Sequence, residues 1–104
     1  MMENTAENQI NIELTEDVAS GIYSNLAIIT HSNAEFVCDF VQMLPGMPKA
    51  QVKSRVIMTP QNAKRLMRAL MDNIQKYEQQ LGTINEEEIP GNNPMNFGPP
   101  TTQA

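Results

Sequence analysis

The fold is decided by residues 50–82, which read AQVKSRVIMTPQNAKRLMRALMDNIQKYEQQLG. An alternating run at residues 50–58 predicts a strand, and Thr59-Pro60 predicts that a helix starts directly after it. The Thr59 hydroxyl can accept a hydrogen bond from a free backbone N–H of the first turn, and Pro60 lacks only an N–H that has no partner within a helix. Gly82 is the matching stop signal, because it can take the left-handed conformation after the last turn.

The predicted helix carries a narrow apolar stripe along one side. Its members recur at alternating spacings of four and three residues and are Ala63, Met67, Leu70, Ile74, Tyr77 and Leu81, with Leu66 and Met71 beside them. Such a stripe predicts a helix laid on a sheet. The same spacing also fits a short helix–helix seam across a dimer axis, although the segment is too short to establish a coiled coil.

Three further strands are predicted upstream of this segment. Their apolar residues alternate or cluster between turn signals, and they span residues 9–14, 22–31 and 34–44. Thr15–Gly21 predicts a single helical turn that Thr15 caps and Gly21 ends. Ser32-Asn33 predicts a two-residue hairpin loop, and the prolines at residues 45–48 turn the chain again. We therefore expect an α+β fold, with a mostly antiparallel sheet of about four strands and one long C-terminal amphipathic helix.

The two turns also predict which residues face each other across the strands. A loop at residues 32–33 sets the pairs Ala27–Cys38 and Ile29–Phe36. The next turn sets Phe36–Met58, Cys38–Val56 and the opposite-charge pair Asp39–Arg55. Cross-strand apolar packing and the charge pair both favour this register.

This register divides the side chains between two faces. The first face, which the helix is expected to cover, holds Ala27, Ile29, Phe36, Cys38, Phe40, Val52, Val56 and Met58. The second face holds Leu26, Ile28, Val37, Val41 and Ile57 among the charged residues Glu35, Asp39, Lys53 and Arg55. The second face is too apolar to be left in water, so the first strand, a second subunit or another partner must cover it. A core of about 75 residues is also marginal alone. We therefore expect a homodimer that buries the five apolar residues of the second face.

Composition predicts one compact domain over residues 9–82 of the 104-residue chain. Residues 1–8 and the acidic, Pro-rich residues 83–104 have too little apolar content to order themselves. A short linear motif around Met95–Phe97 is the alternative for the tail. The chain shows no secretion signal and no apolar stretch long enough to span a membrane, so a cytoplasmic location is expected. The single cysteine, Cys38, fits a reducing compartment.

Charge is distributed unevenly along the chain. All seven basic residues lie between positions 49 and 76, whereas the whole protein carries a net charge of −5. A binding surface can be drawn from five of them: Lys53, Arg55, Lys64, Arg65 and Arg68. Charges on one surface can contact phosphates, so nucleic-acid or phosphate binding is the alternative function. The acidic pI of about 4.7 and the lack of an aromatic stacking stripe favour a solvated face instead.

Residues able to carry chemistry are few. His31 lacks neighbouring ligands for a metal site and the nucleophile and orienting group that a catalytic base needs. Tyr23, Asn25 and His31 can line a polar pocket, or else serve structural roles. Cys38 is expected to be a small core residue. No catalytic carboxylate pair and no phosphate-binding Gly-rich loop is present, so we expect no enzymatic activity, metal or cofactor.

Two blocks of the chain resemble a known family. The first, GIYSNLAIITHSNAEFVCDFVQMLPG, contains Tyr23-Ser24-Asn25, His31-Ser32, Asp39-Phe40 and Pro45-Gly46. The second, KSRVIMTPQNAKRLMRALMDNIQKYE, contains Thr59-Pro60 and Ala63-Lys64. Over residues 9–81 these features resemble small bacterial proteins catalogued only as a domain of unknown function. The resemblance implies a compact, strand-rich fold that ends in a helix, and it supplies no activity. We therefore expect a non-enzymatic, homodimeric protein-interaction or regulatory module.

Overall fold

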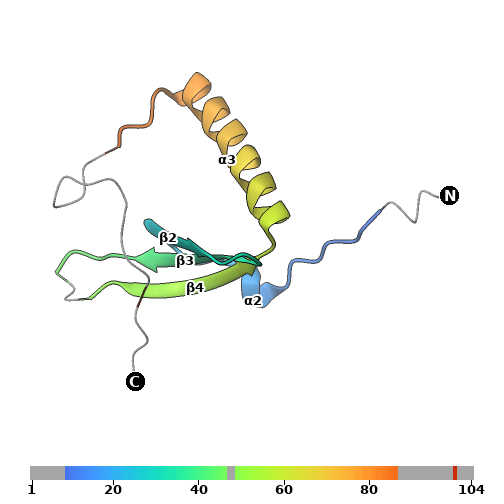
Figure 1. Ribbon diagram of the computed structural model, residues 1–104. Coiled ribbons are helices and arrows are strands. Elements are labelled where there is room, and N and C mark those ends of the chain that lie inside the picture. The colour runs from blue at the N-terminus through green and yellow to red at the C-terminus, as the bar shows by residue number, and fades with distance from the viewer. Residues whose placement is uncertain (1–8, 47–48, 87–99, 101–104) are drawn as a thin grey trace.

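The computed structural model describes residues 9–46, 49–86 and 100. Its elements are α2 (Glu16–Ala19), β2 (Leu26–His31), β3 (Phe36–Gln42), β4 (Gln51–Met58) and α3 (Pro60–Leu81) (Figure 1). The predicted disorder of residues 1–8, the greater part of the predicted disordered tail and the motif around Met95–Phe97 lie outside the described residues. The α+β class is confirmed, with one long helix following the strands.

The described sheet has three antiparallel strands in the order β2-β3-β4, rather than about four. The prediction of a strand at residues 9–14 is wrong for the single chain, because this segment joins no ladder there. Alternation of apolar and polar residues is a property of the segment alone, whereas a strand also needs a neighbouring edge to complete its hydrogen bonds. Figure 1 shows the segment running away from the sheet.

The short helix α2 lies where the sequence predicts a helical turn. Thr15 stands at its N-cap and accepts hydrogen bonds from the N–H groups of Val18 and Ala19 through its backbone carbonyl. The expected cap by the Thr15 hydroxyl does not form. Gly21 follows the helix with a φ of 76°, so it supplies the positive φ that turns the chain toward β2.

The register between β2 and β3 differs from the prediction by two residues. Ile29 pairs with Cys38 rather than Phe36, and Ala27 pairs with Phe40 rather than Cys38. The cause is the turn: the Ser32 hydroxyl accepts hydrogen bonds from the N–H groups of Ala34 and Glu35, so the loop centres one residue later than expected. A shift of two residues leaves every side chain on its predicted face.

The register between β3 and β4 is confirmed at Phe36–Met58, Cys38–Val56 and Asp39–Arg55. A bulge between Phe40 and Val41 then shifts the pairing, so that Val41 faces Val52. Val52 therefore belongs with the second face, and its assignment to the first face is wrong. The extra residue that a bulge inserts interrupts the alternation on which that assignment rested.

Helix α3 has the predicted ends. The Thr59 hydroxyl accepts a hydrogen bond from the Asn62 N–H at 3.1 Å, and Pro60 occupies the first turn. Gly82 closes the helix with a φ of 98° and a ψ of 167°. It has the positive φ expected of it, but its ψ belongs to the extended region that is essentially restricted to glycine, rather than to the left-handed helical region.

The position of α3 differs from the prediction that it covers the first face. None of its residues is buried. Figure 1 shows the helix rising from the end of β4 at a steep angle instead of lying along the strands. The connection is the single residue Thr59, whose extended backbone sets the direction in which the helix leaves the sheet. The small buried core consists of Leu26, Cys38, Val41 and Met58 together with Asp39.

Candidate interaction surface

The largest group of exposed apolar residues lies on α3. We call the following set the α3 stripe: Leu66, Met67, Leu70, Met71, Ile74, Tyr77 and Leu81. Their exposed fractions run from 39% at Ile74 to 69% at Leu81. Contiguous apolar surface of this kind is uncommon on monomeric soluble proteins and marks sites of interaction. The spacing of these residues is visible in the sequence, but their exposure is not.

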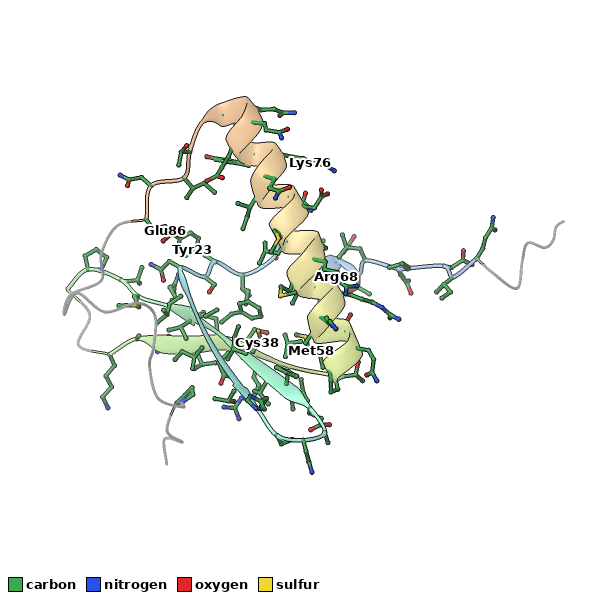
Figure 2. All side chains as sticks on the ribbon, turned by 45° about the horizontal axis from the view of Figure 1, so that its top comes forward. Tyr23, Cys38, Met58, Arg68, Lys76 and Glu86 are labelled. Carbon is green, nitrogen blue, oxygen red and sulfur yellow. The ribbon has the colours of Figure 1, made fainter. Side chains whose placement is uncertain are left out.

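The first turn of α3 contacts the sheet at Met58. The Asn62 side-chain amide lies 3.8 Å from the Met58 sulfur, as a weak hydrogen-bond donor. Figure 2 shows Met58 beside the first turn of the helix, whereas Lys76 lies near its far end, away from the strands. The stripe therefore begins against the first face and continues into open surface.

A second exposed apolar segment precedes α2. Ile10, Ile12 and Leu14 alternate with Asn11 and Glu13, and Ile12 is 91% exposed. We call residues 9–14 the arm. In an extended chain, alternating residues point to the same side, so these three side chains form one apolar side of the arm. A segment of this kind can add to the edge of a sheet.

Asp39 and Arg55 form the only buried ionic contact among the described residues. Asp39 is fully buried, and its two carboxylate oxygens accept hydrogen bonds from Arg55 Nε at 2.6 Å and Nη2 at 3.0 Å. The hydrogen bond and the negative charge of Asp39 raise the pKa of the Arg55 guanidinium above its ordinary value. The Arg55 side chain remains 54% exposed. A two-pronged contact of this kind holds β4 in register against β3.

The five residues of the predicted basic surface are all exposed. Arg55 is committed to Asp39, and Lys53 lies at the bulge, where strand alternation is interrupted. Lys64, Arg65 and Arg68 occupy the first turns of α3, which leaves the sheet at a steep angle (Figure 2, Arg68). The structure therefore divides the predicted surface into a strand part and a helix part.

The predicted polar pocket does not assemble. Asn25 directly precedes β2 and His31 ends it, so the two lie about 20 Å apart at the usual rise per residue. The Asn25 amide instead bonds the backbone of Met43 in both directions, at 2.8 and 2.9 Å, and so extends the ladder beyond the last strand pair. The ring of His31 stacks on Phe36 with centroids 5.3 Å apart, and Tyr23 is exposed.

The predicted dimer face is already partly covered within one chain. Leu26 and Val41 are buried, and Ile28 and Val37 are half-buried. Ile57, which is 57% exposed, is the one member of the five that offers substantial apolar surface. Half of the exposed large apolar residues in the described part of the chain therefore lie on the α3 stripe and the arm.

Side chains that could react or bind a metal ion are either buried or far apart. Cys38 is buried in the sheet, and burial together with the charge of Asp39 raises the pKa of its thiol. Within residues 9–46 and 49–86, no three His, Cys, Asp or Glu side chains lie close enough to hold a metal ion. No helix in the described part of the chain is long and apolar enough to cross a membrane.

Comparison with known proteins identifies a family. A family model described as "Protein of unknown function (DUF3467)" matches residues 1–86, which includes the whole of the sheet and α3. The match extends beyond the residues 9–81 that carry the resemblance in the sequence. No curated protein and no solved structure matches the chain.

Proposed function

The chain belongs to the DUF3467 family of proteins of unknown function, and from this starting point we propose that it is a non-enzymatic protein-interaction or regulatory module that works as a homodimer in the cytoplasm. The observation that carries the proposal is the exposed α3 stripe. A helix with an apolar side toward water is stabilised by whatever covers that side. The single cysteine, Cys38, is free and buried, which fits a cytoplasmic location.

The stripe holds enough apolar surface to drive association. Completing the burial of a side chain that is already half covered adds about 1 kcal/mol, so the stripes of two chains together add on the order of 10 kcal/mol. Association costs about 4–15 kcal/mol in lost freedom of motion. The two quantities are of the same size, so burial of the stripe can offset the cost of association.

A second copy is the partner that the stripe suits best. Two identical helices related by a two-fold axis bury the same patch twice and leave no open end for polymerisation. The spacing of four and three residues along α3 is the spacing of a helix–helix seam. The buried core of a single chain is small, and assembly would stabilise a fold that buries so little apolar surface alone.

The titratable groups support a role without catalysis. The buried carboxylate of Asp39 is held by Arg55, and the raised pKa of the Cys38 thiol keeps it protonated at neutral pH. His31 is stacked on Phe36 at the end of β2. None of these groups has the neighbouring base or nucleophile that would activate it.

Sedimentation equilibrium of the full chain tests the proposal. Leu70→Glu places a charge in the centre of the stripe, whereas Gln79→Glu places the same charge on the opposite side of the same helix. We expect the dimer to dissociate in the first variant and to persist in the second. A wild-type chain that remains monomeric throughout the micromolar range would contradict the proposal.

Nucleic-acid or phosphate binding is the second candidate. It rests on Lys64, Arg65 and Arg68, which are exposed in the first turns of α3. Arg65 and Arg68 lie on the side of the helix away from the stripe, and Lys64 lies beside the edge of the stripe that Met71 forms. These three residues can contact phosphates without disturbing a helix–helix seam. A mobility-shift measurement at low and physiological salt separates this candidate from the first.

A further inference from the structure

The arm at residues 9–14 has the alternating sequence of a strand but has no strand beside it in the described part of the chain. Its backbone is extended, and Ile10, Ile12 and Leu14 are 82%, 91% and 70% exposed. Figure 1 shows that it leaves the body of the molecule and points away from its own sheet. An extended segment with one apolar side is suited to strand addition at the edge of another sheet.

The described sheet has two open edges, along β2 and along β4. Edge strands present unpaired N–H and C=O groups, and these can pair with an added strand. The β4 edge is the longer, at eight residues against six. It also carries Lys53 and Arg55, whereas β2 contains no Lys, Arg, Asp or Glu.

The arm and β4 match in both charge and alternation. Met58 contacts the first turn of α3 through Asn62, so the first face of the sheet is the face toward the helix. If the apolar side of the arm takes that face beside Val56, then Glu13 falls on the face of Arg55. Because Arg55 is 54% exposed despite its bonds to Asp39, it has room for a second carboxylate. A single placement of the arm beside β4 therefore brings apolar side chains together on one face and opposite charges together on the other.

We infer that residues 9–14 form a fourth strand on the β4 edge of a second copy of this chain. This inference rests on the homodimer proposed above and specifies how the two copies exchange segments. The exchange is reciprocal, so each copy gives one arm and accepts one. The apolar side of the arm then fills the angle between the partner's β4 and the partner's α3, next to the α3 stripe.

The test introduces the same charge on opposite sides of the arm of the full chain. Ile12→Asp removes the most exposed apolar side chain of the arm, and Asn11→Asp adds an equal charge on the side that faces Arg55. Sedimentation equilibrium then compares their dimer dissociation constants with that of the wild type. Hydrogen exchange at several protein concentrations reports whether the amides of residues 9–14 are protected.

We expect Ile12→Asp to weaken the dimer at least tenfold, and Asn11→Asp to leave it unchanged or tighter. Arm amides should be protected in the dimer and should lose that protection on dilution. A dimer that neither variant weakens would overturn the arm exchange while leaving the homodimer intact. Equal weakening by both variants, or arm protection that does not depend on concentration, would also overturn it. A wild-type monomer would overturn both proposals.

Discussion

Asp39 is fully buried in the middle of the sheet, and Arg55 on the neighbouring strand donates two hydrogen bonds to its carboxylate. The pair sits directly across the ladder between β3 and β4. A buried carboxylate is costly unless it is paired, so every register that separates these two residues is penalised. The ion pair therefore serves mainly to select one alignment of the sheet.

Removing the guanidinium should destabilise the fold. Arg55→Met leaves Asp39 buried without its partner, whereas Arg55→Lys keeps the charge and loses the two-pronged geometry. We expect urea midpoints to fall in the order wild type, Arg55→Lys, Arg55→Met. Arg68→Met, which removes an exposed arginine of α3, is the control and should change the midpoint little. Equal midpoints for Arg55→Met and Arg68→Met would contradict the structural role.

The helix cap gives a second prediction. Thr59→Ala removes the hydroxyl that accepts the Asn62 N–H and should cost about 1 kcal/mol, while Thr59→Ser keeps the hydroxyl and should cost less. Thermal unfolding followed by circular dichroism measures both. Thr15→Ala is a matched control, because the Thr15 hydroxyl makes no cap bond in α2. A loss at Thr15 as large as that at Thr59 would show that the cap bond is not the cause.

The Cys38 thiol gives a pH-dependent prediction. Its pKa in the folded state is raised, so folding favours the protonated thiol. Its contribution to stability is complete below the unfolded-state pKa of about 8.5 and declines as pH rises through the folded pKa. Unfolding free energies measured from pH 7 to pH 10 should therefore fall less steeply in Cys38→Ala than in the wild type. Identical slopes would show that Cys38 does not titrate with folding.

The pairing of the strands can be predicted from the sequence only where the residues themselves favour one alignment. The pair Asp39–Arg55 and the apolar residues around it are enough to align β3 with β4 as far as the bulge between Phe40 and Val41, which the alternation does not predict. The alignment of β2 with β3 differs from the prediction because Ser32 bonds two backbone N–H groups and moves the turn by one residue. That bond depends on loop geometry rather than on residue pattern.

The location of the apolar surface is harder to predict. Periodicity identifies the side of α3 that needs cover, but it does not say whether the sheet or a second chain supplies the cover. The same holds for the arm, whose alternation is that of a strand although the single chain provides no edge for it. The structure does not bring together the residues of the predicted polar pocket, because Asn25 and His31 lie at the two ends of β2.

The basic residues of α3 give a fourth prediction. Because the chain is acidic overall, we expect no nucleic-acid binding tighter than the nonspecific range, about 10⁻⁶–10⁻⁴ M at physiological salt. Charge reversal at Arg65 and Arg68 should abolish any binding seen at low salt without unfolding the protein. Sequence-specific binding that survives physiological salt would contradict this expectation and favour the second candidate function.

The α3 stripe is the proposed contact between two copies of the chain. Isotope-filtered NOE spectra of a one-to-one mixture of labelled and unlabelled full chain test it most directly. We expect contacts between chains from the methyl groups of Met67 and Met71 to Leu70 and Ile74 of the other copy. Contacts between chains only at Ile28 and Ile57, or none in a protein that sediments as a monomer, would contradict it.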